Sequence, residues 1–192
     1  MKKYNKMVVD WRGEYNQNDK KIGENLVKEM LETLEYEKYT KEELKKIEEY
    51  YEIEEENREN TDLEEEYNKS SLSWYDSFEE FLGREPLEIQ IRLYKKDNLK
   101  IFECSTEGYE GENWLIVEIF YKNELVESSE GAWDGGDFYE DNYFEDFCFE
   151  DLKIIQKLCS EYYKTDGYNC SGFSELDEYI KEKEERTELE EV

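Results

Sequence analysis

Apolar side chains occupy every second position between residues 87 and 94, which is the clearest pattern in the chain. They are Leu87, Ile89, Ile91 and Leu93. A period of two is typical of a β-strand with one buried face. Apolar runs at 99–105, 114–121 and 124–128 follow, separated by segments with turn residues, and predict three more strands. Four consecutive strands joined by short connections favour an antiparallel meander.

Helical periodicity dominates on both sides of these strands. Apolar residues four apart, from Ile22 to Leu34, predict a helix over 20–37, and Thr40 followed by Glu43 is a capping box that opens a second helix over 41–56. A short helix is expected from Ser73 to Leu82. Two further helices, over 150–164 and 174–186, follow the strands, and the run 7–11 is a short candidate strand.

The order of these elements predicts an α+β fold: an antiparallel four-stranded meander packed by helices, with an N-terminal helical pair. We divide the chain into an N-terminal helical region with an acidic second helix, residues 1–72, and a region with the sheet and the C-terminal helices, residues 73–192. We expect the two regions to form one compact unit, because 192 residues suit a single domain.

The strongly acidic composition of the chain adds a second question, which is whether it folds and what its surface binds. The chain has 54 acidic residues against 25 basic ones, a net charge of −29, and only 37% hydrophobic residues. Low hydrophobicity with high charge is typical of disorder, but 17 Tyr, 9 Phe and 4 Trp indicate a folded protein with an acidic surface. The acids are clustered, since residues 101–152 contain sixteen of them and one base, Lys122. Solubility alone does not predict this clustering.

The densest cluster is the acidic-aromatic segment, residues 130–151, which has nine acids, seven aromatic residues and no Lys or Arg. Such a segment, anchored by its rings, suits a basic partner. The candidate partner-binding residues are Trp133, Asp134, Asp137, Tyr139, Glu140, Asp141, Tyr143, Glu145 and Asp146. A secondary acidic patch comprises Glu48, Glu49, Glu52, Glu55 and Glu56. The alternative interpretation is that the acids only face solvent, and we expect Phe144, Phe147 and Phe149 to be core residues.

Common catalytic and metal chemistries find little support. The chain has no His, so Ser-His and Cys-His arrangements are excluded, and it has neither a GxSxG nor a P-loop motif. The run from Asp134 to Asp141 lacks the spacing of an EF-hand loop, and the four Cys form no CxxC pair. We therefore predict no enzyme activity, no cofactor and no metal. A carboxylate-dependent or metal-dependent enzyme is left as an alternative.

No signal peptide and no stretch of about 20 apolar residues is found, which favours the cytoplasm. The abundance of Lys, Glu, Asn, Tyr and Ile is typical of an AT-rich genome, such as that of a low-GC bacterium or its phage. An anionic membrane would repel this chain, and we expect no direct binding to nucleic acid.

The stretches EEYYEIEEENRENTDLEEE and DGGDFYEDNYFEDFCFED resemble the acidic faces of DNA-mimic anti-restriction and anti-CRISPR proteins. This resemblance in composition covers the two stretches. It implies a phage or mobile-element protein that occupies the basic nucleic-acid groove of a CRISPR effector or restriction enzyme. An immunity protein that neutralises a cationic toxin nuclease would have the same features, so both functions stay open.

Overall fold

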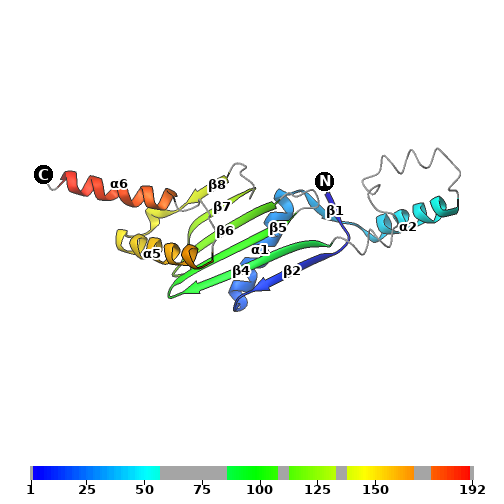
Figure 1. The fold of residues 1–192 in the computed structure, drawn as a ribbon, viewed down its shortest axis with the longest axis horizontal. Coiled ribbons are helices and arrows are strands. Elements are labelled where there is room, and N and C mark those ends of the chain that lie inside the picture. Colours follow the sequence, from blue (N-terminus) through cyan, green and yellow to red (C-terminus); the bar gives the residue numbers. More distant parts are fainter. Residues whose placement is uncertain (1, 57–85, 108–112, 133–137, 167–173, 191–192) are drawn as a thin grey trace.

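A computed structural model provides the fold, which is shown in Figure 1. It describes residues 2–56, 86–107, 113–132, 138–166 and 174–190. Six strands form one mixed sheet in the order β2-β4-β5-β6-β7-β8. These strands are β2 (Met7–Arg12), β4 (Leu87–Lys96), β5 (Leu99–Glu107), β6 (Asn113–Tyr121), β7 (Glu124–Ala132) and β8 (Phe138–Asn142).

The predicted four-stranded antiparallel meander is wrong, because the sheet has six strands and one of its pairs is parallel. The four strands expected from periodicity form at the predicted places, as β4 to β7. Two further strands lie at the edges of the sheet. The candidate strand 7–11 forms as β2 and pairs in parallel with β4, and β8 pairs antiparallel with β7. The sequence pattern did not predict the pairing of β2 with β4 because the two segments are far apart in the chain. It did not predict β8 because this strand is too polar to show an apolar alternation.

The N-terminal helices have different surroundings. Helix α1 (Gln17–Thr33) packs on the sheet, whereas α2 (Lys41–Glu56) extends away from it at one end of the molecule (Figure 1). Between them, β3 (Tyr36–Lys38) pairs in parallel with β1 (Lys2–Tyr4) as a separate two-stranded sheet. Both helices of the expected N-terminal pair form, but only α1 packs on the sheet. The predicted capping box is confirmed: the Thr40 amide donates to Glu43 Oε2 at 2.8 Å, and the Glu43 amide donates to Thr40 Oγ1 at 3.1 Å.

One hydrophobic core lies between α1 and the sheet. Leu26 and Met30 of α1 are fully buried against Ile91, Phe102 and Ile116. The helix can approach closely because position 23 is Gly: a Cβ there would lie 2.4 Å from the Trp11 ring. At the N-terminal end of α1, buried Asp19 accepts hydrogen bonds from Lys95 Nζ at 2.5 Å and Lys100 Nζ at 2.9 Å.

A second core lies on the opposite face of the sheet, under α5 (Phe149–Asp166) and α6 (Ser174–Glu190). Ile155 and Tyr162 of α5 and Leu176 of α6 pack with Val117 and Ile119 of β6. The 3-10 helix η1 (Phe144–Asp146) precedes α5 and buries Phe144, while Phe147 and Phe149 pack partly buried against the same core. The prediction that these Phe are core residues is confirmed for Phe144, whereas Phe147 and Phe149 contact the core from its partly exposed margin.

The sheet joins the two regions into which the sequence was divided, since β2 of residues 1–72 is hydrogen-bonded to β4 of residues 73–192. The short helix expected from Ser73 to Leu82 lies outside the described residues. Among the described residues, no helix combines the length and the apolar character that crossing a membrane requires.

Candidate partner-binding surface

Strand β8 carries the central part of the acidic-aromatic segment and forms one edge of the sheet. Its register with β7 places Tyr139 opposite Glu130, Glu140 opposite Ser129, and Asp141 opposite Ser128. Residues directly opposite each other share a face, and successive residues of a strand point to opposite faces. Tyr139 and Asp141 therefore lie on the side of α1, while Glu140 lies on the side of α6. Charged side chains also protect such an edge from pairing with other strands.

The α1 side of this edge is an acidic surface whose outer residues are exposed. The Tyr139 side chain is 64% exposed, and Asp141 beside it is also exposed. Three further carboxylates reach the same side from other elements: Glu130 of β7, Glu118 of β6 and Glu29 of α1. We call this set the α1-side acidic face, and it comprises Glu29, Glu118, Glu130, Tyr139 and Asp141.

The carboxylates of this face affect one another. Burial raises the pKa of Glu118 to about 7, and the negative charge of Glu29 adds to the effect. The pKa of Glu29 is raised in turn by burial and by the charges of Glu130 and Glu32. A positive charge from a partner would relieve this repulsion and favour the ionised forms.

The α6 side holds a different arrangement, which we call the α6-side carboxyl cluster: Glu127, Glu140 and Glu175. Glu127 of β7 is only 2% exposed, and Asn142 of β8 donates from Nδ2 to Glu175 Oε2 of α6 at 2.8 Å. Burial, followed by the charges of Glu140 and Glu175, raises the pKa of Glu127 to about 8. Glu140 thus faces α6, on the opposite side of the sheet from its neighbours Tyr139 and Asp141.

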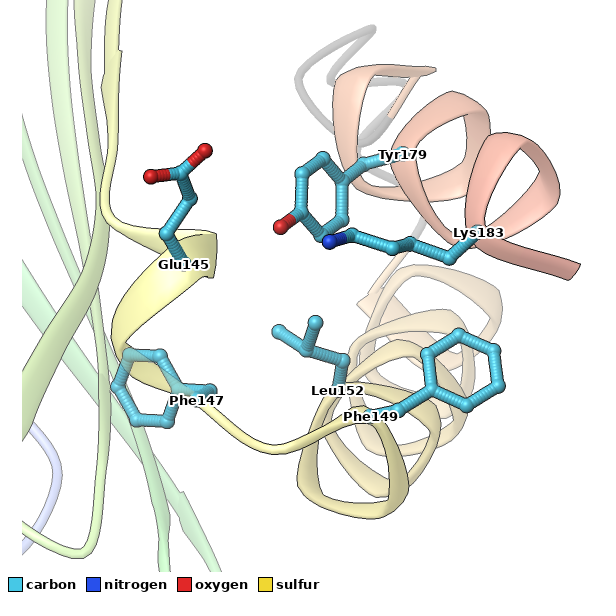
Figure 2. Close-up of a pocket in the computed structure, with 6 residues that line it drawn as sticks. All are labelled: Glu145, Phe147, Phe149, Leu152, Tyr179 and Lys183. Carbon is cyan, nitrogen blue, oxygen red and sulfur yellow. The ribbon is translucent and has the colours of Figure 1, made fainter. Parts of the chain in front are cut away.

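Beyond β8, Tyr143 is 42% exposed, and its backbone amide donates to the Val126 carbonyl at 2.9 Å. Glu145 and Asp146 in η1 are exposed. Glu145 lines an open cavity of about 390 Å³. In Figure 2 it lies across this cavity from Lys183 of α6. The rest of its lining is mostly apolar: Phe147, Phe149, Leu152 and Tyr179. Exposed rings and an apolar cavity therefore lie next to acids.

The structure brings together only part of the predicted site. Tyr139, Asp141, Tyr143, Glu145 and Asp146 are exposed along β8 and η1. Trp133, Asp134 and Asp137 lie outside the described residues. In the secondary patch, Glu48 and Glu49 are exposed, and Glu49 forms an ion pair with Lys45 at 3.0 Å. Glu52, Glu55 and Glu56 belong to the same helix, α2.

Sequence reasoning missed Glu29, Glu118 and Glu130 as neighbours in one surface, because they come from a helix and two strands. Glu118 did carry a signal, as the one acid in the apolar run WLIVEIFY. An acid inside an apolar strand indicates either a buried polar contact or the margin of a covered face.

The described residues give little support for covalent or metal chemistry. No group of three Cys, Asp or Glu side chains in this part of the chain is placed to hold a metal ion. Cys104 and Cys159 are buried, and burial raises the pKa of both thiols, that of Cys104 to about 12. These thiols stay protonated at neutral pH and are poor nucleophiles.

Comparison of the chain with protein-family models, with curated proteins and with solved structures finds no match in any of the three.

Proposed function

We propose that this chain is an acidic inhibitor that binds the basic nucleic-acid groove of a defence nuclease, a CRISPR effector or a restriction enzyme. In this proposal a phage or mobile element encodes it, and it acts in the bacterial cytoplasm. The observation that carries the proposal is the exposure of Tyr139 and Tyr143 among carboxylates, within a segment that contains no Lys or Arg.

Each part of this surface has a physical role in binding. The carboxylates speed the encounter with a cationic groove and hold the protein in register, because they complement its charge. The two tyrosines supply rigid apolar contact area with a hydroxyl at its end, as is common in binding hot spots.

The sheet gives this surface a fixed geometry. β8 is hydrogen-bonded to β7 over five residue pairs, and Phe144 anchors the chain in the core directly after Tyr143. The exposed groups are therefore held in place before binding, which lowers the entropy lost on association.

The test uses purified full-length chain with two cationic enzymes: a guide-loaded CRISPR effector and a type II restriction endonuclease. We expect inhibition of DNA cleavage at stoichiometric concentration and a complex that weakens as salt rises. A double variant, Tyr139→Ala with Asp141→Lys, should lose at least tenfold in affinity, since a buried anchor and a charge pair each contribute about 1–2 kcal/mol.

The matched control is Glu182→Lys, an exposed acid of α6 that changes net charge as much as Asp141→Lys does. Equal losses for Asp141→Lys and Glu182→Lys would show that net charge alone drives binding. An absence of both inhibition and a salt-sensitive complex with nucleases of either type would refute the proposal. Inhibition confined to a toxin nuclease would favour the immunity function instead.

A further inference from the structure

The α6-side carboxyl cluster connects the sheet to the beginning of α6. Asn142 of β8 lies opposite Glu127 of β7, and its Nδ2 donates to Glu175 Oε2 at 2.8 Å. Glu140, two residues before Asn142, lies on the same face of β8, and burial followed by the charge of Glu175 raises the pKa of Glu140. Glu175 is the second residue of α6, so the Asn142 hydrogen bond holds the first turn of this helix against β8.

Glu127 lies under this contact and is almost fully buried. Its Oε2 atom has no hydrogen-bond partner among the described residues. A buried carboxylate without a partner is strongly unfavourable, whereas a protonated carboxyl group carries no charge. The geometry of Glu127 therefore fits the protonated form.

Among the described residues, the charges that act on Glu127 come from carboxylates and not from a Lys or Arg. From β8 it meets the charge of Glu140, and from α6 the charge of Glu175. Cys159 of α5 is close enough to Glu127 and Asp177 for their charges to act on its thiol. Asp177 of α6 accepts a hydrogen bond from Gln156 Nε2 of α5 at 2.7 Å. Within the described residues, the negative charge of this cluster is therefore reduced by protonation of its carboxyl groups and not by a basic side chain.

Two carboxyl groups can hydrogen-bond to each other only when one of them is protonated, because each ionised group is only an acceptor. We propose that Glu140 and Glu175 share a proton, and that this pair is a latch that docks the first turns of α6 on β8 and opens as pH rises. Opening leaves three negative charges at the contact, since Glu127 loses its proton as well. Like charges at this distance repel.

The direction of the effect follows from the protonation states. Burial and the neighbouring charges raise the pKa of Glu127 to about 8, and the pKa of Glu140 is raised in the same way. The docked state thus binds more protons than the undocked state, so docking weakens as pH rises toward 8 and above. The inference concerns the helix alone and does not depend on the proposed function.

Hydrogen exchange of the full-length protein, read by mass spectrometry at pH 6 and pH 9 and corrected for intrinsic rates, tests the latch. We expect protection of the amides in 174–180 to fall about tenfold or more at pH 9, since one pKa unit corresponds to a factor of ten. Protection of the central strands β5 and β6 should change less. Glu140→Gln should keep α6 protected at pH 9, because the Gln amide stays neutral and can donate a hydrogen bond to Glu175. Glu127→Gln should keep only part of the protection, because it removes one of the three negative charges and leaves Glu140 and Glu175 able to ionise.

Glu118→Gln is the matched control, because it neutralises a carboxyl group with a raised pKa on the opposite face of the sheet. It should stabilise the whole protein at pH 9 but leave the fall in protection of 174–180, measured relative to β5 and β6, unchanged. Protection of α6 that is equal at pH 6 and pH 9 in the wild type would overturn the proposal. The same holds if Glu118→Gln preserves α6 protection at pH 9 as well as Glu140→Gln does. Glu140 is only partly buried, so this variant tests the latch even if Glu127→Gln fails to fold.

Discussion

Tyr139 and Glu140 are neighbours in the chain but lie on opposite faces of β8: Tyr139 is opposite Glu130 on the α1 side, and Glu140 is opposite Ser129 on the α6 side. The acidic-aromatic segment is therefore divided between two environments. One is an exposed surface that can meet a partner, and the other is a contact with α6. Substitutions at adjacent positions should have different effects for this reason.

Glu140→Lys should stabilise the protein at pH 8, by about 1 kcal/mol, because it places a cation beside Glu127 and Glu175. Urea unfolding at pH 8 measures the change. Asp141→Lys is the matched control and should change stability by less than about 0.5 kcal/mol, as is usual for an exposed position. Destabilisation by Glu140→Lys would contradict the described environment of Glu140.

Asp19→Asn should destabilise the protein by about 3–5 kcal/mol, because it leaves Lys95 and Lys100 without the carboxylate they share. Burial acts to raise the pKa of Asp19, but the hydrogen bonds from Lys95, Lys100 and the Asn16 amide outweigh it, so the pKa is lowered. The stabilisation from Asp19 is then fully present above the ordinary pKa of 3.8 and is lost as pH falls through the lowered pKa.

Urea unfolding of wild type and Asp19→Asn at several pH values between 7 and 2 checks this prediction. The difference in the free energy of unfolding should be constant near neutrality and shrink only below pH 3.8. A difference that disappears already at pH 5 would show that Asp19 is not held in its ionised form by the two lysines.

Gly23→Ala should cost about 1–3 kcal/mol, although Ala normally favours helices, because the new Cβ would lie 2.4 Å from the Trp11 ring. Thermal unfolding measures the change. The double variant with Trp11→Leu should recover part of the loss relative to Trp11→Leu alone, since coupling between contacting residues is not additive. Lys21→Ala, at an exposed position of the same helix, should be nearly neutral.

Glu118→Gln should stabilise the protein at pH 9 but not at pH 4.5. Burial and the charge of Glu29 raise the pKa of Glu118 to about 7 from an ordinary 4.5, so ionisation of this group opposes folding only as pH rises above 4.5. The gain at pH 9 is at most about 3.5 kcal/mol, because the pKa is raised by about 2.5 units and each unit corresponds to about 1.4 kcal/mol. Glu24→Gln, an exposed position of α1, should show no such pH-dependent gain.

Sequence periodicity was sufficient to place individual elements. The alternation from Leu87 to Leu93 predicted β4, and the Thr40–Glu43 pair predicted where α2 begins. Strand β8 was missed because its sequence, FYEDN, has one face toward solvent and another toward carboxyl groups, so no apolar alternation marks it. The parallel pairing of Val9 with Ile89 was missed because register between distant segments leaves no local signal.

The candidate surface was predictable in position but not in composition. Clustered charge indicated the region around Tyr139 and Asp141, and the structure exposes both. It adds Glu29, Glu118 and Glu130 through the sheet register and the packing of α1. Such convergence depends on tertiary structure, which composition alone does not determine.

The parallel pairing of β2 with β4 has a consequence for how the chain folds during synthesis. The first strand of the sheet leaves the ribosome about eighty residues before its partner, so it has to wait for residues 87–96 before it can pair. Closing so long a connection makes this a late and slow step compared with the hairpins from β4 to β8. A fragment that starts at residue 73 would lack both β2 and α1, and it would leave Ile91, Phe102 and Ile116 open to aggregation.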